Sequence, residues 1–393
     1  MNTRKMTGNT DSSYLYLDSD QQLVEFCQLI EPANYIAIDT EFVREKTYYP
    51  ELSLIQVATE QHQACIDPQC INDFSPFVAL LVNPEIIKVL HSPSQDMELF
   101  YQQFNCHTVS VFDTQLAAAL LGYASQIGYA DLVKQLTGTQ LDKAYTRTNW
   151  NKRPLSAAEL DYAMDDVIYL LPVYLSLQKA LVEKHRFDWM TAEFDRYADP
   201  ALFQPDLNQL WKKLKGVQKI SGFSLQIAQL LCVWRESLAQ KKNLPKRWVI
   251  QDDVIIEISR IKPNSISGFE HFRQIKPGFI KQYGNEILSV LETASNIPEP
   301  EWPRHSKMQK LNTNQQALGD CLMALCRLFA GQHQIAIASL VTRKDIDQLI
   351  LDRKNCKLAS GWRLQLVGQH LIDFIGGKNS LNVIDGQIVF HGE

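Results

Sequence analysis

The run Tyr35–Phe42 constrains the fold of this chain most, because apolar residues lead directly into two carboxylates. Residues 35–38 lack polar alternation, which is typical of a central strand covered on both faces. Side chains alternate along a strand, so Asp39 and Glu41 project from one face while Thr40 points away. Two adjacent carboxylates repel each other, and divalent cations that prefer oxygen ligands relieve the repulsion. An acidic strand end is more often simply solvated, so this pair needs support from elsewhere in the chain.

Composition and charge limit the classes of protein to consider. The 393 residues suffice for two or three domains, and 45% hydrophobic with 21% charged residues is typical of a globular protein. Residues 1–200 carry 14 Lys and Arg against 27 Asp and Glu, whereas residues 201–393 carry 25 against 17. An acidic half joined to a basic half favours contact with nucleic acid, although two domains with unlike solvated surfaces would show the same pattern.

Targeting signals and cysteines point to an ordinary intracellular setting. Residues 1–8 hold two basic residues without an apolar core behind them, so we expect no signal peptide. No apolar run is long enough for a membrane span. The eight cysteines form neither a CxxC pair nor a Cys/His cluster of zinc spacing. We therefore expect free thiols in a reducing compartment, by default the cytoplasm.

Strand and helix patterns alternate up to about residue 195, which predicts an α/β domain with a mixed sheet. The first strands follow one another so closely that an antiparallel meander is expected. Pro172 should bend or divide the last helix of this region. The expected strands are 14–17, 36–42, 52–58, 64–67, 86–90 and 109–112, and the expected helices are 20–30, 74–82, 94–104, 114–121, 127–136 and 157–181. Beyond about residue 206 helical patterns dominate.

Two further carboxylate positions can join the opening pair. Asp96 lies in the first turn of the helix predicted over 94–104, where acids also favour the helix dipole. Tyr162 and Asp166 stand at i and i+4 on one face of a later helix, whereas Asp165 points about 100° away, which we interpret as toward solvent. Four carboxylates supply oxygen ligands for two divalent ions, and such a pair assists phosphodiester hydrolysis at both the attacking and the leaving oxygen.

These motifs resemble the DEDDy subgroup of 3′→5′ exonucleases, and within it the bacterial ribonuclease D family. DTEFVR at 39–44 with TYYP at 47–50 is similar to the family's first motif, Asp96 to the aspartate of its second, and YAMDDV at 162–167 to its third. The segments LDK at 141–143 and TNWNKRPL at 148–155 are similar to its connecting region, so the resemblance covers roughly residues 14–190. Two departures are Pro-Ser-Gln before Asp96, where the family often has Gly and Glu, and Asp165 where a small residue is common.

The resemblance implies a definite domain organisation. A ribonuclease H-like α/β exonuclease domain, with a mixed sheet flanked by helices, is expected at residues 1–205. Two all-α HRDC-like helical bundles are expected at 206–296 and 313–393, joined by a Pro-rich linker at 297–312. The first bundle carries the clearer similarity, and the second rests on its position and helical periodicity.

The resemblance also implies an activity. We expect a metal-dependent 3′→5′ exoribonuclease that releases nucleoside 5′-monophosphates and matures the 3′ ends of tRNA precursors and other small structured RNAs. The expected cofactors are two divalent ions, Mg²⁺ or Mn²⁺, and the expected partner is RNA with a free 3′ end, without a membrane. The residues expected to be catalytic are the metal ligands Asp39, Glu41, Asp96 and Asp166, together with Tyr162, which would position the attacking water.

Six further residues are candidates for substrate contact: Phe42, Tyr48, Tyr49, Lys143, Trp150 and Arg153. Their aromatic rings could stack on terminal bases, at roughly 1–3 kcal/mol per base, but core packing explains them equally well. Their cations could meet phosphates or be solvated loop charges. Basic residues between 212 and 247 are expected to form a sequence-independent phosphate track. A direct role for His91 is disfavoured, because DEDDy enzymes use tyrosine to orient the water.

Two alternative functions stay open. The first is a DNA 3′→5′ exonuclease of the same superfamily, which is disfavoured because the chain has no G-x-x-x-x-G-K-[ST] helicase motif and no extra domain of polymerase size. The second is a non-catalytic RNA-binding scaffold, which the intact set of carboxylates and Tyr162 makes unattractive. Digestion of matched RNA and DNA oligonucleotides would separate all three functions.

Overall fold

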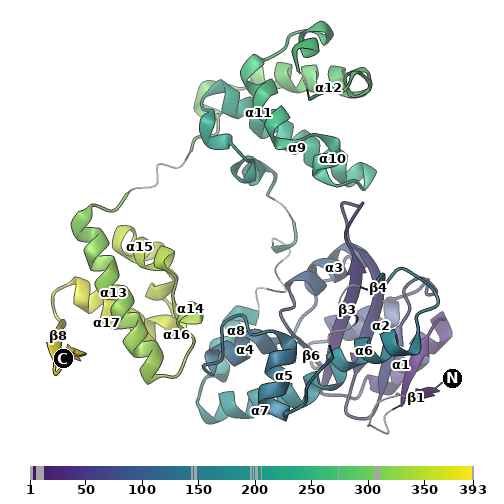
Figure 1. Cartoon of the computed structure of the whole chain (residues 1–393), viewed down its shortest axis with the longest axis vertical. Coiled ribbons are helices and arrows are strands. Elements are labelled where there is room, and N and C mark those ends of the chain that lie inside the picture. Colours follow the sequence, from purple (N-terminus) through teal and green to yellow (C-terminus); the bar gives the residue numbers. More distant parts are fainter. Residues whose placement is uncertain are drawn as a thin grey trace. The chain divides into compact units, whose positions relative to one another are not determined.

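The structure is a computed structural model, and the chain folds into two compact units (Figure 1). Unit 1 consists of Met1–Glu41, Ser53–Ala198 and Gln309–Glu393, and unit 2 consists of Phe42–Leu52 and Asp199–Met308. The structure describes all residues except 1–2, 6–12, 143–144, 146–147, 195–196, 198, 200–201, 205, 273, 306–309 and 392–393.

Unit 1 is built on a seven-stranded mixed sheet in the order β1-β2-β5-β4-β3-β6-β7. The strands are β1 (Thr3–Lys5), β2 (Ser13–Leu17), β3 (Tyr35–Val43), β4 (Glu51–Ala58), β5 (Gln63–Ile66), β6 (Ile87–Leu90) and β7 (Val111–Asp113). The antiparallel pairing expected at the start of the sheet is confirmed for β4 and β5. β2 instead pairs parallel with β5, and β3, β6 and β7 are also parallel neighbours. Asp39 and Glu41 of β3 therefore sit on an inner strand of the sheet.

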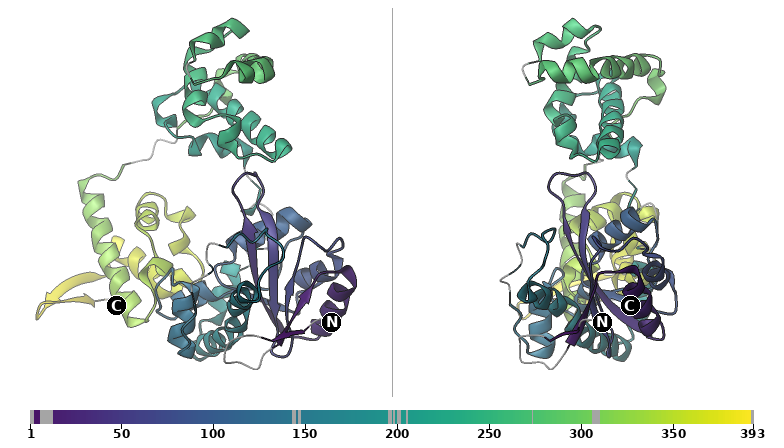
Figure 2. Two further views of the ribbon diagram at one scale, coloured as in Figure 1. Left: turned by 45° about the vertical axis from the view of Figure 1, so that its right-hand side comes forward. Right: turned by 90° about the vertical axis from the view of Figure 1, so that its right-hand side faces the viewer.

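Helices lie on both faces of this sheet (Figure 2). One buried cluster joins Ala37 and Leu54 of the sheet to α5, α6 and α7. On the other side α1, α2 and α3 pack with one another, with the Phe77 ring 5.9 Å from that of Phe100. The helices are α1 (Asp20–Ile30), α2 (Ser75–Val82), α3 (Ser94–Phe104), α4 (Thr114–Leu120), α5 (Tyr129–Thr137), α6 (Ala157–Ile168), α7 (Leu170–Glu183) and α8 (Phe187–Phe194).

The helix predicted over residues 157–181 is divided, as Pro172 required. α6 ends at Ile168 and α7 begins at Leu170, so Pro172 lies in the first turn of α7, where a missing backbone N–H breaks no helical hydrogen bond. The start of α6 is set by a capping box, in which Ser156 and Glu159 exchange side-chain and backbone hydrogen bonds. This cap fixes the helix that carries the third motif.

Unit 2 is helical apart from the turn between β3 and β4. Its 3₁₀ segments are η3 (Leu207–Lys213), η4 (Val217–Lys219), η5 (Ile266–His271) and η6 (Glu299–Glu301), and its helices are α9 (Phe223–Lys242), α10 (Lys246–Val249), α11 (Asp252–Ile261) and α12 (Pro277–Ser295). The strand turn is held by α9: the hydroxyl of Tyr48 donates to Glu236, and the Asn243 side-chain oxygen accepts from the backbone N–H groups of Tyr48 and Tyr49, each at 3.1 Å.

Residues 310–391 pack into unit 1. We expected residues 313–393 to form a bundle of their own, yet Leu322 and Leu371 belong to the same buried cluster as the sheet. The indole rings of Trp189 and Trp362 stack with centroids 4.9 Å apart. Arg186 donates hydrogen bonds to the carbonyl oxygens of Leu120 and His333. The elements are α13 (Thr313–Gln332), α14 (Ile337–Leu340), α15 (Arg343–Leu351), η7 (Arg353–Asn355), η8 (Lys357–Ala359), α16 (Gly361–Arg363), the π-helix η9 (Leu364–Gly368), α17 (Gln369–Ile375), β8 (Ser380–Ile384) and β9 (Gln387–His391).

The expectation that this second helical block is all-α is wrong at its end, where β8 and β9 form an antiparallel hairpin. The turn residues Asp385 and Gly386 both have positive φ, 51° and 75°, as a two-residue turn between twisted strands requires. The flanking strands are rich in β-branched residues. The Asp-Gly pair was a readable hairpin signal that helical periodicity upstream obscured.

No single helix among the described residues has both the length and the low polarity of a membrane span. α13 together with α14–α15 (Ile337–Leu351) meets the criteria of length and composition only as a pair bent by 114°.

Candidate active site

Three of the predicted ligands meet on β3. The carboxylates were expected at a strand end, but β3 continues past them to Val43, so Asp39 is its middle residue. Asp39 and Glu41 project from the same face of the strand, and Asp166 approaches from α6. One carboxylate oxygen from each of the three lies within 4.8 Å of the others. All three side chains are half-buried. The strand spacing i, i+2 and the packing of α6 over this face thus bring together side chains that lie more than a hundred residues apart in sequence.

Asp96 reaches the same region from the opposite layer. It lies in the first turn of α3 and is buried. The hydroxyl of Thr40 donates to its Oδ1 at 2.5 Å. Because Thr40 points away from the face of Asp39 and Glu41, this hydrogen bond holds Asp96 against β3 from the α3 side. The fourth predicted ligand is thus not one of the group whose oxygens lie within 4.8 Å, but it is close enough for its charge to act on Asp39 and Glu41.

Crowding of the four carboxyl groups makes them hard to ionise. Burial and then the neighbouring carboxylates, Asp166 most of all, raise the pKa of Asp39 well above its ordinary value. The same causes raise the pKa of Glu41 to about 8. Burial raises the pKa of Asp166 to about 7 and that of Asp96 to about 6. A set of oxygen donors that repel one another in this way fits hard divalent cations, which supply the missing positive charge.

Tyr162 stands one helical turn before Asp166 on α6, as the spacing predicted. Its half-buried ring lies beside Tyr145, at 5.9 Å between centroids, and beside Trp150, at 6.4 Å. Asp165 is half-buried rather than simply solvent-facing, and burial with the charges of neighbouring carboxylates raises its pKa to about 6. The phenol and Asp166 thus belong to one side of α6.

His91 has a structural environment. Its Nδ1 lies 3.0 Å from the Thr114 hydroxyl and its Nε2 lies 3.0 Å from the carbonyl oxygen of Ile127. Both ring nitrogens are thereby occupied by α4 and by the segment before α5. Burial lowers the pKa of this imidazole, which favours the neutral form in that setting. These contacts agree with the choice of Tyr162 over His91.

Two of the six candidate substrate residues are engaged inside unit 1. Trp150 is 4% exposed and belongs to the buried cluster, so its ring packs rather than faces a base. Arg153 forms a two-point ion pair with Asp67, at 2.6 and 2.7 Å, and donates to the carbonyl oxygens of Ser53 and Trp150. Its guanidinium is occupied within the fold instead of facing a phosphate.

The other four candidates lie around the β3–β4 turn or outside the described residues. Tyr48 packs against the core of unit 2 and is hydrogen-bonded to Glu236. Tyr49 is 36% exposed and Phe42 is half-buried, so both rings stay candidates for base stacking. Lys143 lies outside the residues that the structure describes.

Two residues near the carboxylates were missed from the sequence. Thr40 separates the two acids of the first motif, but its partner Asp96 cannot be identified until α3 is placed. Tyr129 donates to the backbone carbonyl of Asp165 at 2.9 Å, and burial followed by the charges of Asp166 and Asp39 raises its pKa well above the ordinary value. It lies at the first residue of α5, a position without any motif to mark it.

Comparison with known proteins agrees with this geometry. A family described as 3′-5′ exonuclease matches residues 14–182, and the HRDC domain family matches residues 224–291. Ribonuclease D of Acidiphilium cryptum is 33% identical over 368 residues, 93% of this chain and 94% of that protein. Ribonuclease D of Gluconacetobacter diazotrophicus is 33% identical over 352 residues, 89% of each.

A solved structure extends the similarity to three dimensions. Escherichia coli RNase D, described as an exoribonuclease involved in structured RNA processing, superposes with a TM-score of 0.81 at 29% identity, over 93% of this chain and 99% of that one. The HRDC match covers the first helical block, and the assignment of a second HRDC bundle stays a prediction. The extent of these matches and the carboxylates gathered at β3 lead to one conclusion: the chain belongs to the ribonuclease D family of 3′→5′ exoribonucleases.

Proposed function

We propose that the chain removes nucleotides one at a time from the 3′ end of RNA with two divalent ions, Mg²⁺ or Mn²⁺, held by Asp39, Glu41, Asp96 and Asp166. The observation that carries this proposal is the convergence of three carboxylates within 4.8 Å. Asp96 is outside that group, accepts a hydrogen bond from Thr40, and acts with its charge on Asp39 and Glu41, which supports it as the fourth ligand. All donors are oxygen atoms, and their raised pKa values reflect charges that no cationic side chain of the set offsets.

The chain's own residues would divide the work as follows. Asp39 and Glu41 come from an inner strand, so the sheet fixes their direction, and the Thr40 hydroxyl fixes that of Asp96. Held by these carboxylates, divalent ions would supply the positive charge that phosphodiester hydrolysis needs. α6 holds Asp166 and Tyr162 one above the other, so the same helix that completes the ligand set also offers a phenol hydroxyl to the reacting water.

Tyr162 is proposed to orient the attacking water rather than to take its proton. Its ring is supported from behind by the buried indole of Trp150. A fixed ring keeps the hydroxyl in one position, which is what orientation of a water molecule requires. The test is Tyr162→Phe, which should lower kcat by about 100-fold and leave KM nearly unchanged.

Tyr145→Phe is the matched control, because it removes a neighbouring phenol hydroxyl while the ring next to Tyr162 stays. It should retain turnover within a few fold. Full turnover by Tyr162→Phe would show that the proposed role is wrong, and equal losses in both variants would point to packing of the rings instead.

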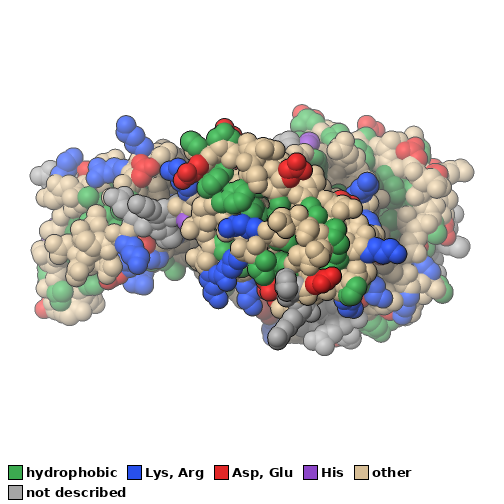
Figure 3. Space-filling view, turned by 90° about the horizontal axis from the view of Figure 1, so that it is seen from above, with side chains coloured by type: hydrophobic (Ala, Val, Ile, Leu, Met, Phe, Trp, Pro, Cys, Tyr) green, Lys and Arg blue, Asp and Glu red, His purple; other side chains and the backbone are tan. Residues whose placement is uncertain are grey.

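The proposed substrates are tRNA precursors and other small structured RNAs. This follows the description of the Escherichia coli relative as acting in structured RNA processing, together with the excess of Lys and Arg in the second half of the chain. On the face drawn in Figure 3, Lys and Arg side chains form separate groups among acidic and apolar ones. Separate groups of Lys and Arg can contact phosphates at several positions, which suits recognition of an RNA by its shape rather than by a long base sequence.

A tRNA extended by extra 3′ nucleotides provides the decisive substrate. With Mg²⁺ or Mn²⁺ we expect a ladder of products that shorten from the 3′ end and stop near the structured stem, with nucleoside 5′-monophosphates released. A matched single-stranded DNA should be cut much more slowly. Equal digestion of DNA would favour the DNA exonuclease, and no digestion of any RNA with a 3′-hydroxyl would favour the binding scaffold.

A further inference from the structure

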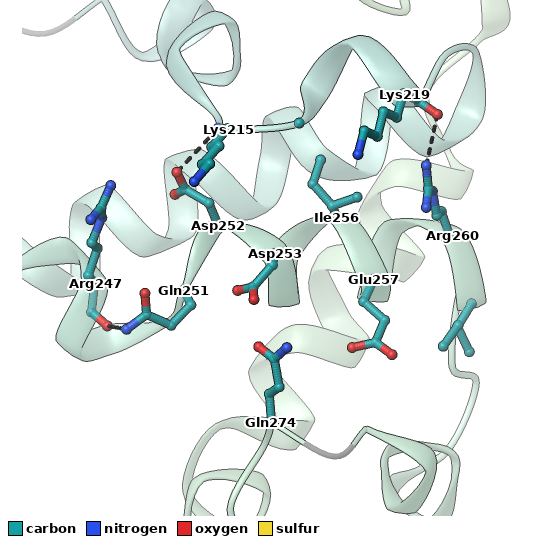
Figure 4. A pocket seen from close by; sticks show the side chains of 12 residues that line it. Lys215, Lys219, Arg247, Gln251, Asp252, Asp253, Ile256, Glu257, Arg260 and Gln274 are labelled. Carbon is teal, nitrogen blue, oxygen red and sulfur yellow. Dashed lines mark hydrogen bonds between the residues drawn. The ribbon is translucent and has the colours of Figure 1, made fainter.

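A pocket of about 760 Å³ opens on unit 2, and the residues that line it belong to that unit. It lies between η4, α11 and the residues that precede α12. Pockets of this size are typical of sites for a small ligand or a single nucleotide. Figure 4 shows the polar side chains that line it.

One side of the pocket carries positively charged side chains. Lys215 and Lys219 flank the turn at Gly216, and Arg247 stands on α10. Their charged groups form no salt bridge among the residues that the structure describes; the one polar contact of Lys215 here is its backbone N–H, which donates to Asp252. Arg260 donates to the backbone carbonyl of Lys219 at 3.1 Å, which secures the turn. Ammonium groups presented in this way suit a phosphate.

The other side carries hydrogen-bond acceptors. Asp253 and Glu257 lie one turn apart on α11, and Gln274 faces them, as Figure 4 shows. Asp252 is excluded from this group, because its carboxylate is paired with the nearly buried Arg235 at 2.6 Å. Asp253 and Glu257 form no salt bridge within the described part of the chain. Asp253 Oδ1 accepts from the backbone N–H of Val254 at 3.0 Å, so Asp253 Oδ2 and the Glu257 carboxylate are the acceptors offered to a ligand.

We infer that this pocket binds one unpaired nucleotide of the RNA, with its phosphate on Lys215 and Lys219 and the amino edge of its base on Asp253 and Glu257. Carboxylates accept from the exocyclic amino group of cytosine, adenine or guanine. Uracil presents carbonyl oxygens on either side of its N3–H, so it would set acceptors against acceptors. The pocket thus favours amino-bearing bases over uracil. This inference rests on the proposed function in taking RNA as the ligand.

A plain phosphate track would not be built this way. Sequence-independent binding arises from cations that follow the backbone, and two carboxylates beside them weaken it by repulsion. A base-reading role gives the carboxylates a purpose, since each good pair of hydrogen bonds to a base edge discriminates by roughly tenfold or more.

The test compares oligocytidylate with oligouridylate of equal length, since the two differ only in the base edge. Binding is measured by fluorescence anisotropy on the full-length chain carrying Asp39→Asn, which keeps the RNA intact. We expect oligocytidylate to bind about tenfold more tightly. The double variant Asp253→Asn/Glu257→Gln should bring that ratio close to one. Glu270→Gln is the matched control, an exposed acid of the same unit outside the pocket, and should leave the ratio unchanged.

The cationic side is tested separately. Lys215→Gln/Lys219→Gln should weaken both oligonucleotides alike and reduce the slope of log affinity against log salt by about 0.7 for each lost phosphate contact. Lys281→Gln, an exposed lysine on α12, is its control. Equal affinity for the two oligonucleotides, or a uniform gain of affinity when the carboxylates are neutralised, would overturn the inference.

Failure of the pocket and failure of the proposed function are distinguishable. The p-nitrophenyl ester of uridine 5′-monophosphate carries a single nucleotide, so its turnover by the otherwise unaltered chain reports chemistry at the carboxylates. The pocket variants should leave this turnover unchanged. If the unaltered chain lacks all nuclease activity while the preference for cytosine persists, the proposed function is wrong and the inferred pocket is supported. If the chain degrades RNA but shows no preference for cytosine, the proposed function is supported and the inferred pocket is wrong.

Discussion

Unit 1 contains two contrasting groups of charged residues. Arg153 and Asp67 form an ion pair, whereas Asp39 and Glu41 of β3 and Asp166 of α6 bring three carboxylates together. Although burial raises it, the hydrogen bonds from Arg153 and Tyr16 hold the pKa of Asp67 below its ordinary value. At Asp39 and Glu41 burial and neighbouring charges act in the same direction and raise the pKa. The charge of Asp67 is balanced by Arg153 within the protein, whereas the charges of Asp39, Glu41 and Asp166 require bound cations to balance them.

This difference separates stability from catalysis. Charges that pair within the protein hold segments together, and the removal of one partner leaves the other buried and uncompensated. Charges that repel one another weaken the free protein, and they persist because bound cations make use of them. Substitutions in the two groups should therefore have opposite effects on folding and turnover.

The largest effect is expected from Asp39→Asn. The loss of a metal ligand should lower turnover of a 3′-labelled RNA by at least about 1000-fold. Without divalent ions the unfolding temperature should stay level or rise, because one of the repelling charges is gone. A marked drop in unfolding temperature would show that Asp39 stabilises the fold as Asp67 does, and would contradict the proposed difference between the two groups.

Arg153→Met should do the reverse. Asp67 is 1% exposed, and the substitution leaves its carboxylate without a cationic partner. The free energy of unfolding should therefore decrease by about 3–5 kcal/mol. Turnover per folded molecule should remain within about twofold of the unaltered chain. Denaturant unfolding gives the first quantity and active-site titration corrects the second. Lys179→Met is the control, since its exposed pair with Glu183 should contribute less than about 0.5 kcal/mol.

The pH dependence of stability should also differ in sign. A raised pKa at Glu41, to about 8, and at Asp166, to about 7, means that the folded state favours the protonated forms. The stability that these groups contribute at low pH is lost as pH rises through those values. In a chelator the unfolding temperature should thus fall as pH rises from about 4, where these carboxyl groups ionise in the unfolded chain, to about 8, where Glu41 ionises in the folded chain. Added Mg²⁺ should raise the unfolding temperature more at the upper end of this range.

Asp67 supplies the internal comparison for that experiment. Its lowered pKa means that its contribution is present at neutral pH and is lost only in acid, as pH falls through the folded value. In Asp39→Asn the fall in unfolding temperature with rising pH should be shallower, whereas the loss in acid below about pH 4 should be unchanged. A fall of full size toward about pH 8 in that variant would contradict the assignment to the carboxylate group.

Thr40→Val should have the smallest effect of the series. The loss of the hydroxyl frees Asp96 without removing a ligand, so the Mg²⁺ concentration for half-maximal activity should rise by about tenfold. Thr40→Ser keeps the hydroxyl and should restore the ordinary metal dependence. If valine and serine raised the Mg²⁺ requirement equally, packing of the methyl group rather than the hydrogen bond would be responsible.

Local patterns anticipated much of the fold and most of the site. The alternation along β3 placed Asp39 and Glu41 on one face, and helical spacing placed Tyr162 above Asp166. Pro172 divided its helix as its missing N–H required. These predictions succeeded because each depends on residues a few positions apart, where backbone geometry alone decides which side chains share a face.

Contacts between distant segments could not be read in the same way. Arg153 and Asp67 are 86 residues apart, and no pattern in either segment identifies the other residue as its partner. The amphipathic pattern of α13 requires that one face be buried but does not specify the partner, so its packing in unit 1 appeared only in the structure. The hydrogen bond from Thr40 to Asp96 likewise depends on which layer α3 occupies.

The shared core of unit 1 has a consequence for the order of synthesis. Residues of α7 and α8 leave the ribosome long before α13 and α16, although Trp189 and Trp362 stack in the finished unit. At roughly 5–20 residues per second, on the order of ten seconds pass between these events. During that interval the nascent chain presents an apolar surface that only its own last segment can cover, so delayed translation of the 3′ end of the message prolongs exposure to aggregation.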